Sequence, residues 1–257
     1  MTQEQALPLT AATATPAKPL QAKLVPKSPA GAARLPATTT DHLIVYVSAG
    51  SYAAADAVAM AEPLEEALEY VEQRTGMRLL RPINVVFDRR SDGCGLDAIA
   101  YTHVRTMSLY TCPNTPARRA VNILAHEFVH QLAHDHYGEP HLEADLILSE
   151  GLATWGAGEY WLSGEANFHD FVAKHYADRL LPLATDPRAG ASIDTLNQIY
   201  YQWAAYVEWI DATYGRDALE ELYGAGLGRQ PGSAPYQQVL GISFTDAELQ
   251  WRASLQQ

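Results

Sequence analysis

The segment 123–134, with the sequence ILAHEFVHQLAH, contains three histidines and one glutamate among large apolar side chains. The apolar residues recur at the spacing of a helix that packs against a core. Residues four apart lie one above the other on such a helix, so His126 and His130 can direct ring nitrogens at one ion. Glu127 follows His126 directly, which completes the H-E-x-x-H arrangement. In that arrangement two neutral imidazoles bind zinc and the glutamate is the general base for a zinc-bound water.

A catalytic zinc site also needs a third protein ligand and an open coordination position. The stretch 148–155, LSEGLATW, supplies Glu150 within a second apolar segment of helical character. A glutamate is costly to bury there unless it is paired or bound to a metal. Gly151 and Ala153 are small enough to let two helices approach closely. We therefore predict one catalytic zinc ion held by His126, His130 and Glu150, although this ligand set also accepts cobalt or manganese.

The H-E-x-x-H motif, nineteen intervening residues and then a glutamate resemble the gluzincin metallopeptidases of the thermolysin-like clan. HEFVHQL and LSEGLATW are most similar to the two metal helices of the compact peptidase MA-like domains. Further similarity lies in PLEEALEYVEQRTG and PINVVF upstream, and in IYYQWAAYVEWIDATYG and TDAELQWRASL downstream. The resemblance covers about residues 42 to 255. It implies a zincin-like fold and a zinc metallopeptidase that acts on peptide or protein substrates.

The same resemblance implies roles for residues beside the three ligands. Glu127 is expected to be the general base that later returns a proton to the leaving amine. Tyr200, in the Tyr-x-Gln pattern, is expected to donate a hydrogen bond to the oxyanion of the tetrahedral intermediate. Tyr201 is the alternative, because neighbouring helix positions point about 100° apart and only one of the two can face the zinc.

Substrate binding and specificity follow from three further comparisons with the family. The strand 106–110, TMSLY, is expected to be the edge strand that holds an extended peptide by backbone hydrogen bonds. Thermolysin-like enzymes have an aspartate four residues after the zinc glutamate, but this chain has Thr154 there. Support for the histidine ligand is therefore expected from elsewhere. The chain has no G-x-M-E-N motif for a free peptide N-terminus, which favours an endopeptidase.

Other ionisable residues near these motifs receive structural interpretations. His134 stands four residues beyond His130, where the helix face turns away, so we interpret it as a core or solvent-facing residue. Glu143 and Asp145 are interpreted as acidic residues that favour a helix N-terminus.

The element pattern predicts an α+β fold, with a small N-terminal mixed β-sheet and a helix, followed by a mostly helical half that carries the metal-site helices. Residues 1–40 contain six of the fifteen prolines and almost no large apolar residues, so we interpret them as a flexible leader or linker. Residues 41–257 form the predicted metallopeptidase domain. Its predicted strands are 42–48, 83–87, 98–104 and 106–111, and its predicted helices are 52–74, 116–136, 143–160, 165–179, 197–214, 216–227, 235–240 and 245–255.

The charge of the chain excludes some classes of partner. Residues 1–40 carry four basic residues and one acidic residue, a sum of +3, so the formal charge of −12 leaves −15 on residues 41–257. Nucleic acids and anionic membrane surfaces are therefore not expected as partners. No apolar run is long enough to span a bilayer. We expect an extracytoplasmic or secreted location, with a cytoplasmic one left open because no signal segment is visible. The sequence predicts no oligomeric state.

The two cysteines and the overall function each leave alternatives open. Cys94 and Cys112 flank two strand-like runs, so they can pair in an oxidising compartment, and two reduced thiols are the equal alternative. The rival to a peptidase is a non-catalytic binding or scaffold protein with a gluzincin-like fold. A further hypothesis is that the basic segment 1–40 lies across the acidic domain and inhibits it.

Overall fold

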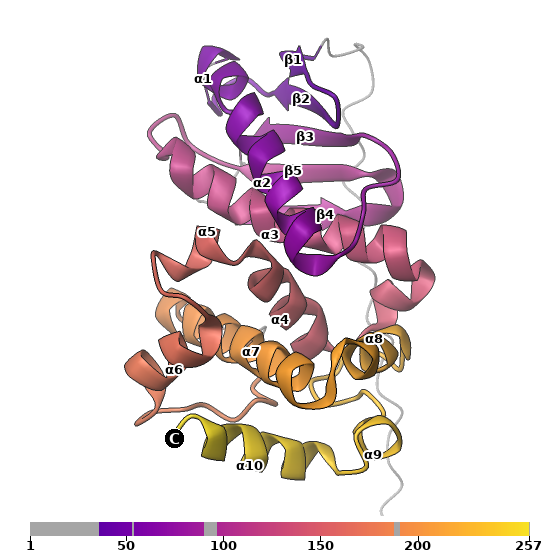
Figure 1. The fold of residues 1–257 in the computed structure, drawn as a ribbon. Helices are drawn as coiled ribbons and strands as arrows, with labels where there is room; N and C mark the ends of the chain where they lie inside the picture. Colours follow the sequence, from indigo (N-terminus) through magenta and orange to yellow (C-terminus); the bar gives the residue numbers. More distant parts are fainter. Residues whose placement is uncertain (1–35, 53, 90–96, 188–190, 257) are drawn as a thin grey trace, which may run out of the picture. The chain divides into compact units, whose positions relative to one another are not determined.

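The computed structural model describes residues 36–52, 54–89, 97–187 and 191–256 of the chain. These residues belong to one compact unit, Leu35–Gln257. A small sheet comes first along the chain and a mostly helical remainder follows (Figure 1). The predicted α+β class is therefore confirmed.

The sheet has five strands in the order β1-β2-β3-β5-β4. Its three central strands run parallel to one another, and β1 and β4 pair antiparallel to them at the two edges. The strands are β1 (Thr38–Thr39), β2 (Leu43–Val47), β3 (Ile83–Asp88), β4 (Asp97–Tyr101) and β5 (Thr106–Tyr110). Burial alternates along the central strands, so one face of the sheet contributes its β-branched and apolar side chains to the core.

The position of the edge strand corrects the sequence-based expectation. The segment 106–110 is β5, which pairs with β3 on one side and with β4 on the other. Among the described residues, β4 (97–101) is the strand that ends the sheet on this side. After β3 the chain forms the edge strand β4 first and then returns to form β5 between β3 and β4. Periodicity in the sequence cannot tell which of the two strands is at the edge. The expected boundary of the leader at residue 40 was also wrong. Thr38 and Thr39 form β1, which pairs with β2 at the opposite edge of the sheet.

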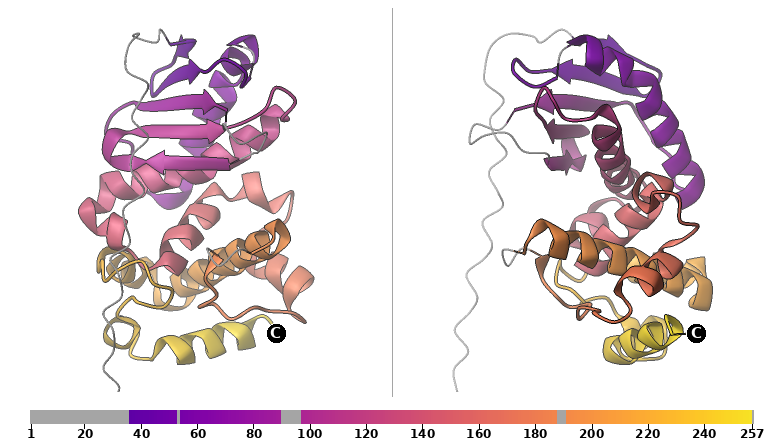
Figure 2. Two further views of the ribbon diagram at one scale, coloured as in Figure 1. Left: turned by 180° about the vertical axis from the view of Figure 1, so that it is seen from behind. Right: turned by 90° about the vertical axis from the view of Figure 1, so that its left-hand side faces the viewer.

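Helices α2 (Ala61–Thr75) and α3 (Ala117–Tyr137) cover the buried face of the sheet, as the views in Figure 2 show. The predicted helix 52–74 is two helices, because the short α1 (Ala54–Ala59) ends before Met60. Pro63 lies in the first turn of α2, where its missing N–H needs no partner. The side chains of Ala120, Leu124 and Phe128 hold α3 against the core.

The helical remainder lies on the side of the sheet where β4 is found (Figure 1). The predicted helix 143–160 is interrupted at Gly158, which has a positive φ of 45°. The elements are η2 (Glu139–Glu143), α4 (Leu146–Ala157), α5 (Glu159–Leu162), α6 (Phe168–Tyr176), α7 (Ile193–Tyr214), α8 (Arg216–Gly224), α9 (Tyr236–Val239) and α10 (Phe244–Ser254), and a short turn η1 (Thr102–Val104) precedes β5. No described helix combines the length and apolarity that a bilayer crossing requires.

Helix α4 is buried on almost every side and lies between α3 and α7. A Cβ atom at Gly151 would come within 2.7 Å of the carbonyl oxygen of Trp203 in α7. A Cβ atom at Gly156 would come within 2.7 Å of Val129 in α3. The small residues therefore set the distance between α4 and its two neighbours, and with it the position of Glu150 relative to the histidines of α3. This confirms the prediction that Gly151 allows close approach.

Candidate metal centre

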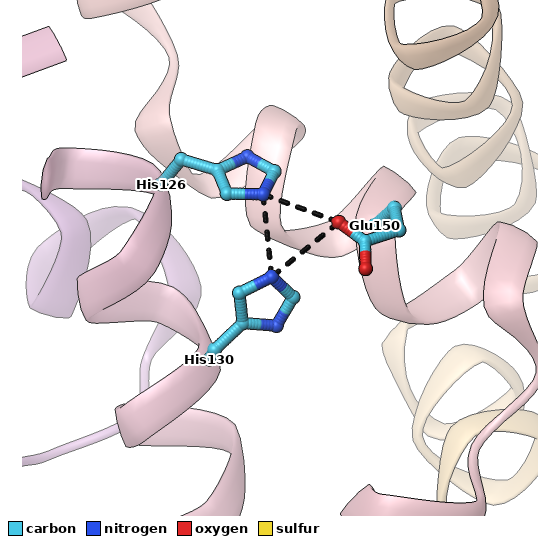
Figure 3. Close-up of side chains that lie close together, drawn as sticks. All are labelled: His126, His130 and Glu150. Carbon is cyan, nitrogen blue, oxygen red and sulfur yellow. Dashed lines mark hydrogen bonds and ion pairs between the residues drawn. The ribbon is translucent and has the colours of Figure 1, made fainter. Parts of the chain in front are cut away.

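Three ligand atoms from α3 and α4 converge at one point (Figure 3). The Nε2 atoms of His126 and His130 lie 3.2 Å apart. The Oε2 atom of Glu150 lies 3.3 Å from the first of these nitrogens and 3.5 Å from the second. We call these three side chains the metal cluster. They are the three residues that the sequence predicts as ligands.

The distances between the three ligand atoms of the metal cluster fit a tetrahedrally coordinated ion. Bonds of about 2.0–2.1 Å at tetrahedral angles place ligand atoms roughly 3.3–3.4 Å from one another, close to the three observed distances of 3.2, 3.3 and 3.5 Å. Two imidazole nitrogens and a carboxylate oxygen are also ligands that first-row divalent ions accept. The buried group can therefore hold a metal ion.

The charges of the metal cluster support one another. Burial acts to raise the pKa of Glu150, but the charge of His130 and hydrogen bonds from both histidines hold that pKa well below its ordinary value. Burial acts to lower the pKa of His130, and the Glu150 carboxylate outweighs it, so the net shift is upward. Glu150 therefore remains an anion, which is the form that ligates a metal.

Thr154 orients one of the histidine ligands from within α4. Its hydroxyl Oγ1 lies 3.3 Å from Nδ1 of His126, and its side chain is completely buried. When Nδ1 carries the ring proton, it donates to this oxygen and leaves the lone pair of Nε2 directed at the metal cluster. The expectation that this support comes from elsewhere was wrong. The hydroxyl occupies the position four residues after Glu150 and makes the contact itself.

Glu127 lies beside the metal cluster but does not belong to it. Its side chain is buried where α3 faces β4. Burial raises the pKa of its carboxyl, although the charges of His126 and His130 and the backbone N–H of Ala100 act in the opposite direction. The carboxyl group of Glu127 is thus next to the two histidines of the metal cluster and next to the strand β4.

The two candidate tyrosines have different surroundings. The ring of Tyr200 stacks on His126, with centroids 5.8 Å apart and an 8° angle between the ring planes. The charge of Glu150, followed by burial, raises the pKa of Tyr200 well above its ordinary value, so its hydroxyl stays protonated. Tyr201 instead donates its hydroxyl proton to the carbonyl of Trp161 and stacks on Phe171. Only Tyr200 therefore lies against a residue of the metal cluster.

A cavity of about 560 Å³ opens onto the metal cluster. Its walls are β4, the exposed side of α3, the aromatic residues of α5 and the N-terminal turns of α7. Arg119 lies on α3 toward the helix N-terminus, and His141 and Arg229 line the cavity beyond His130. Burial, then the charges of His130 and Arg229, lowers the pKa of His141 to about 3, so this imidazole is neutral at physiological pH.

Arg229 is a site residue that the sequence analysis did not single out. Its Nη2 lies 3.4 Å from Oε1 of Glu150, the oxygen that is not shared with the histidines. It stands in the glycine-rich loop between α8 and α9, 79 residues after Glu150. No local pattern connects the two positions. The one available signal was a lone basic residue among glycines, and that is too common in turns to indicate a site.

The remaining predictions near the site have mixed outcomes. Asp145 caps α4 by accepting a hydrogen bond from the backbone N–H of Ile147 at 2.9 Å, as predicted for this helix start. His134 does not join the metal cluster, and its Nδ1 is buried without a partner in the described part of the chain.

Cys112 is disulfide-bonded, whereas Cys94 lies outside the described residues. The segment 1–35, with most of the hypothetical inhibitory leader, lies outside them as well.

Comparison of the chain with protein-family models, curated proteins and solved structures gives no significant match. The assignment of a function therefore depends on the geometry of the metal cluster and its cavity.

Proposed function

We propose that this protein is a zinc-dependent metallopeptidase of the gluzincin type, which hydrolyses internal peptide bonds. The observation that supports this most is the convergence of His126, His130 and Glu150 at tetrahedral spacing, directly beside the buried carboxylate of Glu127. Two imidazoles and one carboxylate leave a fourth position open, which is typical of catalytic rather than structural zinc sites.

Glu127 would perform the proton transfers. A zinc ion held by the metal cluster would supply a Lewis acid that polarises the peptide carbonyl and makes water more acidic. Glu127 would accept a proton from the attacking water and later deliver it to the leaving amine. Its side chain is buried beside Ala100, at the wall of the cavity.

Tyr200 would stabilise the negative charge that develops on the carbonyl oxygen. A phenol with a strongly raised pKa remains a hydrogen-bond donor at neutral pH. Its stacking on His126 holds the ring beside the metal cluster. Tyr201 does not suit this role, because its hydroxyl is already bonded to Trp161.

The edge strand β4 would bind the peptide backbone of the substrate. Residues 97–100 line the cavity, and the strand pairs with β5 on its inner side. An extended peptide can add to such an edge as a further strand. Because Ala100 is also next to Glu127, this binding mode would bring a peptide bond to the general base.

The test is a comparison of the wild-type protein with Glu127→Gln on a broad peptide library. We expect the variant to keep about one zinc per chain but to lose roughly 10²–10⁴-fold in hydrolysis, the usual contribution of a general base. Glu139→Gln, which changes an exposed glutamate in η2, is the matched control and should cleave normally. Unchanged cleavage by the zinc-loaded Glu127→Gln protein would refute the mechanism. Zinc binding with no cleavage of any peptide by the wild type would instead favour the non-catalytic binding protein.

A further inference from the structure

We propose that Arg229 binds a carboxylate of the substrate close to the bond that is cleaved. The carboxylate is either an acidic side chain or a free C-terminus, and the two sources share the chemistry that a guanidinium recognises. This inference rests on the proposed function, because it specifies the substrate of the same site.

Arg229 lies next to Glu150 at the wall of the cavity. Its Nη2 contacts Oε1 at 3.4 Å, while Oε2 of the same carboxylate faces the two histidines. A guanidinium has five N–H donors in a planar fork, and within the described residues Glu150 is the one hydrogen-bond partner of Arg229. The side chain is 38% exposed and lines the cavity. Most of its donors are therefore available to a bound molecule.

Metal binding would change the balance of charge around Arg229. In the metal-free protein the Glu150 carboxylate compensates the charge of Arg229. A divalent ion bound to the other oxygen of Glu150 would neutralise the carboxylate. The positive charge of the ion would also repel the guanidinium. At short range in a partly buried site, such repulsion is stronger than in water. An added carboxylate would restore the balance, so metal loading would turn Arg229 into an anion site.

Hydrogen bonds fix the loop around Arg229 to the start of α4. The carboxylate of Asp145 is 2% exposed and accepts four hydrogen bonds. Their donors are the backbone N–H groups of Ile147, Gly232 and Ala234 and the hydroxyl of Tyr236, at 2.9–3.3 Å. On the other side of Arg229, Gly228 donates its N–H to the carbonyl of Glu143 at 2.8 Å.

This anchoring determines where the guanidinium lies. Both ends of the loop are bonded to the residues just before the helix that carries Glu150, so the position of Arg229 relative to the metal cluster is set by the fold. A binding group that is held in place before the ligand arrives loses less freedom on binding. The arrangement is therefore suited to recognition and goes beyond a single surface ion pair.

The experiment uses matched peptides that differ only in a carboxylate. At each position around the cleaved bond, glutamate is compared with glutamine, and each peptide is made with a free and with an amidated C-terminus. Binding is measured to the zinc-loaded Glu127→Gln protein, where turnover is slow, and kcat/KM is measured with the wild type. We expect an acidic or free-acid peptide to bind about 10- to 100-fold better than its neutral counterpart, the usual effect of a hydrogen bond to a charged group. A preference for glutamate over glutamine would identify a side-chain carboxylate, and a preference for the free over the amidated C-terminus would identify the terminal carboxylate.

Two variants connect the preference to Arg229. Arg229→Gln should abolish it, and Arg229→Lys should retain part of it, because lysine keeps the charge but not the planar fork. Arg118→Gln removes an exposed arginine of α3 that does not line this cavity and should leave the preference unchanged. Zinc content is measured for every variant, and the lysine variant serves if the glutamine variant loses metal.

The outcomes separate this inference from the proposed function. Equal binding of acidic and neutral peptides, or a preference that survives in Arg229→Gln, would overturn the role of Arg229 even if the protein is a peptidase. A preference that depends on Arg229, in a protein that cleaves none of the peptides, would retain the carboxylate site and reject the peptidase.

Discussion

Helix α3 contributes to two groups of ionisable side chains that are shielded from water, and the polar atoms of the two groups are arranged differently. One is the metal cluster, in which His126 and His130 meet Glu150. The other is Asp135, near the C-terminal end of the same helix, with Arg105 from the turn before β5. The side chains of Asp135 and Arg105 are 4% and 13% exposed, so both groups keep charge away from water.

The difference lies in how the polar atoms are satisfied. Arg105 binds Asp135 with two nitrogens on two oxygens, and the carboxylate also accepts hydrogen bonds from the backbone N–H of Leu80 and from Gln131. Every contact pairs a donor with an acceptor. In the metal cluster, by contrast, two imidazole nitrogens and one carboxylate oxygen all lie within 3.2–3.5 Å of one another, and each can ligate a metal once it carries no proton. Burial of charge is thus common to both, and the mutual convergence of three ligand atoms is what indicates a metal site.

Removal of one ligand from the metal cluster is expected to have the largest effect. Structural zinc binds to the four ligands of zinc-finger peptides with about 10–16 kcal/mol, which is up to about 4 kcal/mol for each ligand. Loss of one ligand in His130→Ala or Glu150→Gln should therefore weaken zinc binding by roughly 10³-fold. The variants should keep their fold, since the helices α3 and α4 are held together by the apolar core around them. Zinc stoichiometry and competition with a chromophoric chelator measure the effect. Wild-type zinc affinity in either variant would mean that the cluster is not a metal site.

Disruption of the Arg105–Asp135 pair should have the converse result, a loss of stability with zinc binding unchanged. Breaking a buried pair from one side costs roughly 3–5 kcal/mol, because the remaining charge is left uncompensated. We therefore expect Asp135→Asn to lower the free energy of unfolding in urea by about this amount. If the variant also loses zinc, the two groups on α3 are not independent.

The same pair predicts a pH dependence. Burial acts to raise the pKa of Asp135, but hydrogen bonds from Arg105 and from the Leu80 N–H hold it below its ordinary value. A depressed pKa in the folded state contributes stability that is fully present above the unfolded-state pKa of about 3.9 and is lost as the pH falls through the folded-state value. The wild type should therefore lose this contribution below about pH 4, and the loss should be absent from Asp135→Asn. Urea unfolding between pH 2 and pH 5 measures the difference.

The residues of the metal cluster were predictable because short-range rules specify most of the arrangement. The spacing of His126 and His130 depends only on helix periodicity, and Gly151 indicated that the helix of Glu150 packs closely on a neighbour. The order of β4 and β5 was not predictable, since both strands alternate and the choice of edge is made by tertiary pairing. Arg229 was not predictable either, because its contact with Glu150 spans 79 residues and depends on a loop anchored by Asp145.

The next effect concerns catalysis and not metal binding. Tyr200→Phe removes the hydroxyl beside the metal cluster. If Tyr200 has the proposed role, kcat for peptide hydrolysis should fall by about 10²–10³-fold, the usual effect of removing an oxyanion donor, with zinc affinity unchanged. Tyr201→Phe is the matched control, since its hydroxyl is bonded to the Trp161 carbonyl away from the cluster. It should cost about 1 kcal/mol of stability and little activity. Equal losses of kcat in the two variants would contradict the assignment.

The smallest expected effect comes from the hydroxyl of Thr154. In the Arg105–Asp135 pair hydrogen bonds fix the side chains, and this variant tests whether one hydrogen bond does the same for His126. Thr154→Val keeps the shape of the side chain but removes the oxygen that lies 3.3 Å from Nδ1 of His126. The ring would then lose the partner that fixes its orientation and its proton, and supporting residues of this kind change metal affinity by about 10- to 100-fold. Thr154→Ser retains the hydroxyl and should remain close to the wild type. If Thr154→Val binds zinc as tightly as the serine variant, then packing alone orients His126, and the convergence of the three ligands depends on the helices without help from a hydrogen bond.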